Sequence, residues 1–145
     1  MTISTMIPAD VKAMESLDLT GMPAGWQGES LLADLNLNYS LNLVAKGANG
    51  IVGILNAHRV GTEAHLNNIF VLLEYRKTGI GKALINMMLK RFEGGISRIT
   101  LEVRQSNTNA KRFYLENEFI VVGKRPNFYE NPREDAVIME RIIKR

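Results

Sequence analysis

Cysteine is absent from this chain of 145 residues. Its absence excludes disulfide bonds, thiolate metal sites and a catalytic thiol. Histidine is almost as scarce, because only His58 and His65 are present, which is too few to predict a metal site. We interpret both histidines as surface residues or cross-strand neighbours, and we expect no metal.

Long apolar runs are also absent. No stretch reaches the roughly 18 consecutive apolar residues that predict a membrane span. The first residues do not combine a basic region with an apolar one, which is the pattern of a signal peptide. The composition, 46% hydrophobic and 23% charged, is typical of a globular protein. We therefore expect a single domain, residues 1–145, that is cytoplasmic and does not contact a membrane.

Positive charge is concentrated in the second half of the chain. Residues 1–60 contain three Lys or Arg and five Asp or Glu, whereas residues 75–125 contain eleven basic and four acidic residues. Such a region attracts polyanionic ligands, although a solvated basic face is the simpler interpretation. It carries no aromatic-rich stripe and no nucleic-acid motif, so we expect no direct nucleic-acid binding.

Periodicity and turn residues predict helices and antiparallel strands in the first half. A short strand over Ile3–Ile7 precedes a helix that begins at Pro8, and Ser30–Leu35 forms a second helix. A loop-like stretch, residues 20–28, contains Trp26, which could line a pocket but which we interpret as packing on the core. Strand-like runs follow at residues 39–46, 51–60 and 64–71. Short turns with glycine separate these runs, which is typical of antiparallel hairpins.

The second half alternates between helix and strand. A helix begins near Ile80 and leads to an alternating strand over Ile96–Arg104, and such a crossover connection predicts a parallel strand pair. Ser106 and Asn107 cap a helix that ends near Asn117. The remaining elements are a strand at residues 119–124, a loop at 126–135 and a last strand at 136–142. The fold class is therefore α/β, with a mixed sheet.

The chain is organised around a turn with two glycines, residues 77–82, between a strand end and a helix start. Glycines allow a tight turn, and free N–H groups at a helix start bind anions, so this turn predicts a phosphate site. Ala83 stands where a nucleotide P-loop needs a hydroxyl, and Leu84 where a dinucleotide fingerprint needs its third glycine. The pattern that remains is R-x-x-G-x-G over residues 76–81.

This pattern resembles the cofactor turn of the GNAT acetyltransferases. Two further segments extend the likeness, L-E-V-R-x-S-N-x-x-A over residues 101–110 and R-E-D-A-x-I-M over residues 133–139. Together they are similar to the bacterial branch of the family that acetylates the N-terminal alanine of a small-subunit ribosomal protein. The resemblance covers nearly the whole chain. It implies the GNAT (acyl-CoA N-acyltransferase) fold, with a central sheet that is antiparallel in its N-terminal half, parallel at the cofactor site and flanked by helices.

The resemblance also implies ligands and roles. Acetyl-CoA is the implied co-substrate, and a ribosomal protein N-terminus is the implied acceptor. Glu102 corresponds to the general base and Tyr114 to the general acid. The residues implied in cofactor binding are Ile69, Phe70, Val71, Lys77, Thr78, Gly79, Ile80, Gly81, Lys82 and Asn107. We also predict that Tyr129, in the loop before the last strand, forms one wall of the peptide groove.

Elementary chemistry is compatible with those two catalytic roles. An α-amine has a pKa near 8, against about 10.4 for lysine, so a carboxylate can deprotonate an N-terminus directly or through water. A phenol of pKa about 10 can protonate a departing thiolate, whose thiol has a pKa of about 8.5. Without the resemblance, Glu102 would be interpreted as a surface ion pair with Arg98 or Arg104, and Tyr114 as a core residue.

Two other functions remain open from the sequence. One is a GNAT enzyme that acetylates a protein lysine or a small-molecule amine, for which the acidic pair Glu134 and Asp135 could hold the acceptor. The other is a non-catalytic acyl-CoA-binding module. Retention of both Glu102 and Tyr114 argues against the second alternative.

Overall fold

The computed structural model describes residues 1–17, 28–92 and 95–144. The strands are β1 (Thr2–Thr5), β2 (Ser40–Gly47), β3 (Gly50–Val60), β4 (Glu63–Val71), β5 (Arg98–Arg104), β6 (Ile120–Tyr129) and β7 (Glu134–Ile142). The α-helices are α1 (Pro8–Ala13), α2 (Gly28–Leu35), α3 (Ile80–Arg91) and α4 (Thr108–Glu116), and short 3₁₀ helices are η1 (Met14–Ser16) and η2 (Leu73–Tyr75). Trp26 lies outside the described residues.

The strands form one mixed sheet in the order β1-β2-β3-β4-β5-β7-β6. β1, β2 and β3 pair antiparallel, as do β5, β7 and β6. β4 and β5 pair in parallel through a short register that runs from Glu63 opposite Arg98 to His65 opposite Thr100. The predicted mixed sheet is confirmed, with its parallel pair at the crossover that contains α3.

The chain divides into two compact units. The first comprises Met1–Arg59 and Leu66–Gly94, and the second comprises Val60–His65 and Gly95–Arg145. β4 therefore begins in the second unit and ends in the first. Each unit has its own buried residues, so each unit is stabilised by packing within itself.

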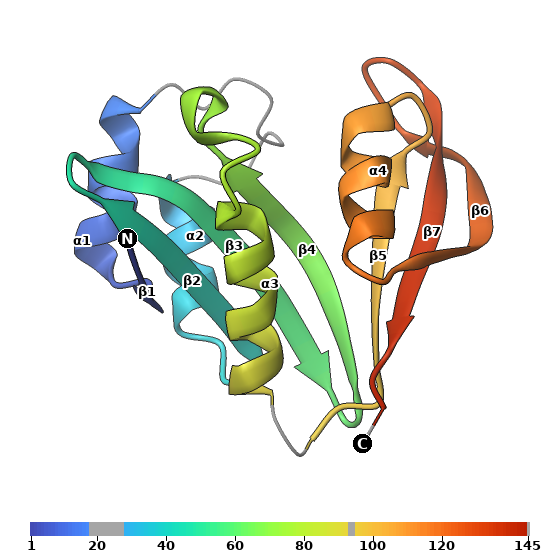
Figure 1. Cartoon of the computed structure of the whole chain (residues 1–145), viewed down its shortest axis with the longest axis horizontal. Coiled ribbons are helices and arrows are strands. Elements are labelled where there is room, and N and C mark those ends of the chain that lie inside the picture. Colours follow the sequence, from blue (N-terminus) through green and yellow to red (C-terminus); the bar gives the residue numbers. More distant parts are fainter. Residues whose placement is uncertain (18–27, 93–94, 145) are drawn as a thin grey trace. The chain divides into compact units, whose positions relative to one another are not determined.

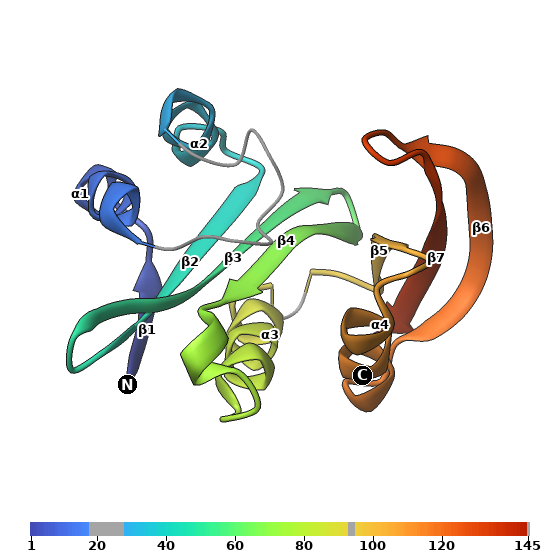
Figure 2. The ribbon, with the colours of Figure 1, turned by 90° about the horizontal axis from the view of Figure 1, so that it is seen from above.

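In the first unit, helices cover both faces of the strands. Figures 1 and 2 show α1 and α2 on one face of β2, β3 and β4, and α3 on the other. The α1 and α2 face buries a cluster of Met6, Val11, Met14, Leu31, Val44, Ile51, Ile54 and Phe70. Gly53 lets α3 approach β3 closely, because a Cβ there would lie 3.2 Å from both the Ile80 side chain and the Phe70 carbonyl oxygen.

In the second unit, β5 shows the alternation that the sequence predicts. Ile99, Leu101 and Val103 are buried, and the residues between them are half-buried. Figure 1 shows α4 beside β5 and β7. Fully buried Phe119, which follows α4, and Met139, on β7, contribute further apolar surface. This leaves the polar face of β5 available for side-chain chemistry.

The predicted loop over residues 126–135 is wrong. β6 continues through Pro126 to Tyr129, and the connection to β7 is confined to residues 130–133. Proline is tolerated because β6 is an edge strand, where a missing N–H need not break a ladder. The pairing is irregular between Arg125 and Tyr129, and Asn127 adopts a positive φ of 53° there.

None of the helices in the described part of the chain is long and apolar enough to cross a membrane.

Candidate active site

The turn with two glycines lies in the first unit, between η2 and α3. Its backbone enters the left-handed region at Lys77, with φ of 61°, and at Gly79, with φ of 90°. Gly79 is the N-cap of α3 and has no side chain with which to cap it. The first bond inside the helix is from the Ala83 N–H to the Gly79 carbonyl at 3.0 Å. The N–H groups of residues 80–82 precede it, and such groups have no partner within a helix.

Side chains around the turn divide into anchoring and exposed groups. Arg76 folds back, because its Nε donates to the Val71 carbonyl at 3.0 Å and its guanidinium lies 5.5 Å from the Phe70 ring centroid. Ile80 is buried in the core, so only its backbone faces the turn. Lys77, Thr78 and Lys82 are exposed, and the Thr78 hydroxyl donates to the Tyr75 carbonyl. The exposed cations and the helix start together favour an anion at this turn.

The strand before the turn carries the three residues predicted to contact the acetyl arm. Phe70 is 7% exposed and belongs to the core, while Ile69 and Val71 are half-buried. The Phe70 side chain therefore packs within the protein, so a contact of this residue with a ligand would come from its backbone. Beside them, the Asn68 side-chain nitrogen is buried without a hydrogen-bond partner among the described residues.

Glu102 lies in the second unit, on the polar face of β5. Its Oε2 is 2.7 Å from Nε2 of His65 on β4, and its Oε1 is 3.4 Å from Nη1 of Arg125 on β6. The hydrogen bond with His65 is the main cause that lowers the pKa of Glu102, and the charges of His65 and Arg125 add to it; together they outweigh burial. Glu102 is therefore ionised at neutral pH but is a weak base.

Among the described residues, Glu102 forms no ion pair with Arg98 or Arg104, the partners that the interpretation without the resemblance would give it. Arg98 pairs instead with Glu63 at 2.7 Å and with Glu140 at 3.3 Å. Arg104 contacts Glu134 at 3.2 Å. The sequence did not predict the contact of His65 with Glu102, although the interpretation of His65 as a cross-strand neighbour is confirmed by its register with Thr100. The predicted parallel pair was a signal for this contact, but the register had to come from the fold.

Tyr114 lies on α4, also in the second unit. Its ring packs edge-on against Phe113 and Phe119, with centroids 5.5 and 5.7 Å away. Burial of the phenol raises the pKa of Tyr114 well above its usual value, and the proximity of Tyr129 adds to this. The phenol is protonated at neutral pH, which is the form that a general acid needs, and its raised pKa makes it a weaker acid than an ordinary phenol.

Tyr129 ends β6 and is half-buried. Burial raises the pKa of Tyr129, the charge of Glu102 raises it further, and the charge of Arg104 opposes this. The Arg104 guanidinium lies 4.4 Å from the Tyr129 ring centroid and also donates to the carbonyls of Glu130 and Pro132. Arg104 therefore holds the short connection between β6 and β7 against Tyr129.

Asn107 has a structural role that the sequence predicted. It is the N-cap of α4, and its Oδ1 accepts from the Ala110 N–H at 3.1 Å. The same side chain carries an Nδ2 group, which can donate hydrogen bonds.

The acidic pair that could have held an amine has partners of its own. The Ser106 N–H donates to Glu134, and Lys124 lies 3.2 Å from Asp135, which also accepts from the Asn127 N–H at 2.8 Å. The hydrogen bonds from Ser106 lower the pKa of Glu134, and the one from Asn127 lowers that of Asp135. Among the described residues, no group of three or more His, Asp and Glu side chains could hold a metal ion.

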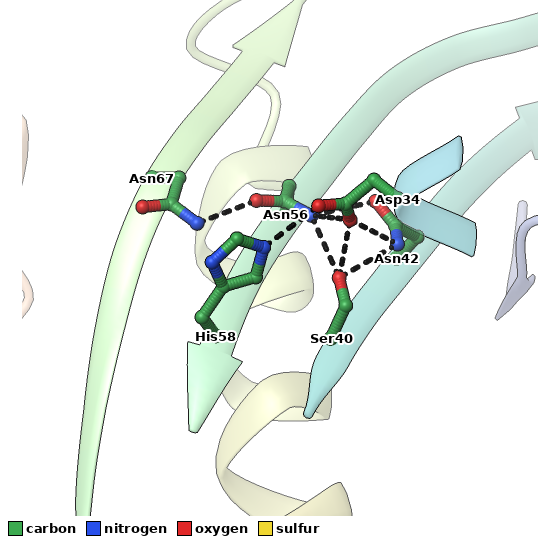
Figure 3. Close-up of polar contacts among 6 residues, drawn as sticks. All are labelled: Asp34, Ser40, Asn42, Asn56, His58 and Asn67. Atoms are coloured by element: carbon green, nitrogen blue, oxygen red, sulfur yellow. Dashed lines mark hydrogen bonds and ion pairs between the residues drawn. The ribbon is translucent and has the colours of Figure 1, made fainter. Parts of the chain in front are cut away.

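A second histidine–carboxylate pair lies in the first unit (Figure 3). Asp34 of α2 accepts at Oδ2 from the Asn42 amide at 2.9 Å, the Asn56 amide at 2.7 Å and the Ser40 hydroxyl. Its Oδ1 is 2.8 Å from His58 Nε2. Burial raises the pKa of Asp34, but these hydrogen bonds and the His58 charge outweigh it, so the net change lowers the pKa. Both oxygens are therefore occupied by the protein itself.

These features match a known class of enzyme. The acetyltransferase (GNAT) domain family matches residues 25–132 of the chain, and the chain belongs to this family. It is an acetyl-CoA-dependent N-acetyltransferase, and acetyl-CoA is its acetyl donor. Solved relatives of the same fold include the Arabidopsis thaliana NAA60 complex with acetyl-CoA, 22% identical with a TM-score of 0.82, covering 98% of each chain.

Within the family, the chain is similar to one group of bacterial enzymes. It is 30% identical over 141 residues to the [ribosomal protein bS18]-alanine N-acetyltransferase of Haemophilus ducreyi, covering 94% of this chain and 97% of that protein. The crystal structure of the ribosomal-protein-S18-alanine N-acetyltransferase from Escherichia coli has a TM-score of 0.84 and 29% identity. The match covers 99% of this chain and 94% of the E. coli chain. The GNAT fold that the sequence predicted is confirmed.

Proposed function

We propose that this enzyme transfers the acetyl group of acetyl-CoA to the N-terminal α-amine of a small-subunit ribosomal protein, with alanine as the first residue. The observation that carries the proposal is the similarity to ribosomal-protein-alanine N-acetyltransferases over nearly the full length of both chains. Such a substrate would be met in the cytoplasm, where ribosomal proteins are made.

The turn of the first unit would hold the pyrophosphate of acetyl-CoA. The N–H groups of Ile80, Gly81 and Lys82 point from the start of α3, and the exposed Lys77 and Lys82 add positive charge. Thr78 and Gly79 complete this anion-binding turn. The backbone of Ile69, Phe70 and Val71 would contact the acetyl and pantetheine arm. Asn107 would contribute its Nδ2 while its Oδ1 caps α4.

The second unit would supply the proton transfers. Glu102, ionised at neutral pH, would remove the proton of the α-amine, directly or through an intermediary. Tyr114, protonated at neutral pH, would donate to the sulfur as the C–S bond breaks. Tyr129, half-buried beside Glu102, would form a wall of the peptide groove.

The experiment compares three acceptors at equal concentration. The first is a peptide that begins with alanine and contains an internal lysine, the second is the same peptide with a blocked N-terminus, and the third is a polyamine. Release of CoA is followed in each case. We expect turnover with the first acceptor, and at most a few per cent of it with the others, because an α-amine is far less protonated than a lysine at neutral pH.

Equal turnover of the blocked peptide would make the enzyme a lysine acetyltransferase, and preference for the polyamine would make it a small-molecule enzyme. Release of CoA with none of them, despite binding of acetyl-CoA, would favour the non-catalytic binding module. Glu134 pairs with Arg104, and Asp135 pairs with Lys124. These ion pairs argue against the polyamine, since neither carboxylate is free to hold a cationic acceptor.

A further inference from the structure

His65 contacts Glu102 at 2.7 Å, and this is the shortest polar contact that either residue makes. The other ring nitrogen of His65, Nδ1, lies 2.9 Å from the Thr100 hydroxyl oxygen. Thr100 and Glu102 share one face of β5, and Thr100 is the register partner of His65 on β4. The three side chains thus form a continuous hydrogen-bonded chain within the second unit.

The ionisation of Glu102 determines how protons are arranged in this chain. An ionised carboxylate only accepts hydrogen bonds, so Nε2 of His65 must carry a proton toward Glu102. In neutral His65, Nδ1 then has the free electron pair and accepts from the Thr100 hydroxyl. This is the arrangement of a hydroxyl, an imidazole and a carboxylate in which the carboxylate holds the tautomer and the imidazole takes up a proton.

Proton counting shows why acetylation needs such a group. Conversion of an α-ammonium group into an amide forms an N–C bond, breaks a C–S bond and removes two protons from nitrogen. One proton ends on sulfur, and Tyr114 can deliver it. The other needs an acceptor that titrates near neutral pH. Imidazole does so, with a typical pKa of about 6.5, whereas Glu102 is a weak base in its present surroundings.

We propose that the acceptor of this second proton is His65, with Glu102 as its positioning residue and Thr100 as the link. Before the amine attacks, the Thr100 oxygen receives a proton of the α-ammonium group and passes its own proton to Nδ1 of His65. The resulting imidazolium is stabilised by Glu102, and the proton then leaves to solvent. The inference rests on the proposed function and deepens it, because His65 becomes the intermediary through which Glu102 acts.

The other charged groups near His65, Thr100 and Glu102 either pair with other residues or contact Glu102 from strand β6. Arg125 of β6 contacts Glu102, and the charge of Glu102 raises the pKa of Tyr129 on the same strand. Glu140 of β7 is the register partner of Thr100, and Arg98 binds both Glu140 and Glu63. His65 has a side-chain exposure of 36%, which leaves an exit for the proton to water.

The decisive variant is His65→Gln, because its amide can still donate to Glu102 but cannot take up a proton. We expect kcat at pH 7 to fall at least about tenfold, with KM for acetyl-CoA unchanged, and the loss to shrink toward pH 9, where the amine is already neutral. Thr100→Val should lower kcat in the same way, and Thr100→Ser should restore it. His58→Gln, at the other histidine–carboxylate pair, is the matched control and should retain wild-type turnover.

Wild-type kcat in His65→Gln across this pH range would overturn the proposal and leave Glu102 as the base on its own. A second measurement is independent of the acceptor. ¹⁵N NMR of the imidazole should find neutral His65 protonated on Nε2 in the wild type, and should find that preference lost in Glu102→Gln. Protonation on Nδ1 in the wild type would overturn the proposal even if the alanine peptide proved not to be a substrate. Failure of that peptide with the wild-type enzyme would instead count against the proposed function alone.

Discussion

Each unit of the molecule contains one histidine beside one carboxylate, at nearly equal distance. His58 lies 2.8 Å from Asp34 in the first unit, and His65 lies 2.7 Å from Glu102 in the second. Their surroundings differ. Asp34 also accepts from one hydroxyl and two amides, and the Asn56 amide oxygen accepts in turn from Asn67 at 2.8 Å (Figure 3). Among the described residues, Glu102 has one further partner, the exposed Arg125 at 3.4 Å.

The different surroundings of Asp34 and Glu102 indicate a structural role for the first carboxylate and a chemical role for the second. A carboxylate saturated by neutral donors that are themselves buried is fixed, because moving it would leave several buried polar groups without partners. A carboxylate whose second oxygen meets only an exposed and distant cation keeps lone pairs for a substrate or a proton. The same two residue types therefore connect α2 to the strands in the first unit and form a candidate catalytic group in the second.

The largest expected effect comes from Glu102→Gln. The amide preserves size but removes the charge that holds and stabilises the His65 imidazolium, so turnover of the alanine peptide should fall on the order of 10²-fold or more, the usual size of the general-base contribution that Glu102 and His65 would make together. Acetyl-CoA affinity, measured by calorimetry, should change little. Raising the pH to about 9 should recover part of the loss, because the α-amine is then mostly neutral. The paired variant, Asp34→Asn, should keep wild-type turnover per folded molecule; an equal loss in both would erase the distinction.

For the free energy of unfolding, we expect a larger effect at Asp34 than at Glu102. Asp34→Ala leaves the Asn42 and Asn56 amides and the Ser40 hydroxyl without their acceptor, and should lower the free energy of unfolding by about 3 kcal/mol. Glu102→Ala removes a half-exposed ion pair and should cost about 1 kcal/mol or less. Urea denaturation of the two variants measures both values. A larger loss for Glu102→Ala would mean that the second pair, too, is structural.

Tyr114→Phe tests the acid that would work with Glu102. Turnover should fall about 10²-fold, because the sulfur loses its proton donor. Unlike the Glu102→Gln loss, this one should persist at pH 9, since the missing proton is the one delivered to the leaving group. The Phe113 and Phe119 contacts remain in the variant, so the melting temperature should stay near that of the wild type. A normal rate with a lowered melting temperature would make Tyr114 a core residue.

Gly81→Val tests the phosphate turn, away from both pairs. Gly81 lies in the first turn of α3, so valine is tolerated by the backbone, whereas Gly79 has a φ of 90° that strains any side chain. We expect acetyl-CoA affinity to fall about tenfold, which corresponds to roughly 1.4 kcal/mol. Asn86→Val, exposed on the same helix, is the control for the effect of valine on helix stability. Unchanged affinity in folded Gly81→Val would exclude the turn as the pyrophosphate site.

The smallest expected effect is the acid dependence of stability at Asp34. Its pKa is lowered in the folded protein, so the stabilisation is present above the unfolded-state value and is lost as the pH falls through the folded-state pKa. Below about pH 4, the free energy of unfolding should therefore decline more steeply in the wild type than in Asp34→Asn. Thermal unfolding between pH 2 and about 6 measures both slopes, and parallel curves would contradict the assignment.

Sequence by itself predicted the parts that depend on local chemistry. The two glycines of the turn, the helical spacing after Ile80 and the alternation of β5 are local patterns, because backbone freedom and side-chain periodicity act over a few residues. The cap at Asn107 is local as well, since its side chain bonds a backbone N–H three residues later. Together with the resemblance, these patterns led to the confirmed fold.

Tertiary structure decided what depends on register and on sheet position. Pro126 was predicted to lie in a loop, but it lies within β6. A strand tolerates proline at the edge of a sheet, and only the strand order reveals that β6 is an edge strand. The pairing of His65 with Glu102 joins residues 37 positions apart and depends on the parallel register of β4 and β5, which a shift of one residue would abolish. Because such contacts depend on register, no local pattern distinguishes His58, whose carboxylate partner is bound by several other side chains, from His65, which lies beside a candidate base.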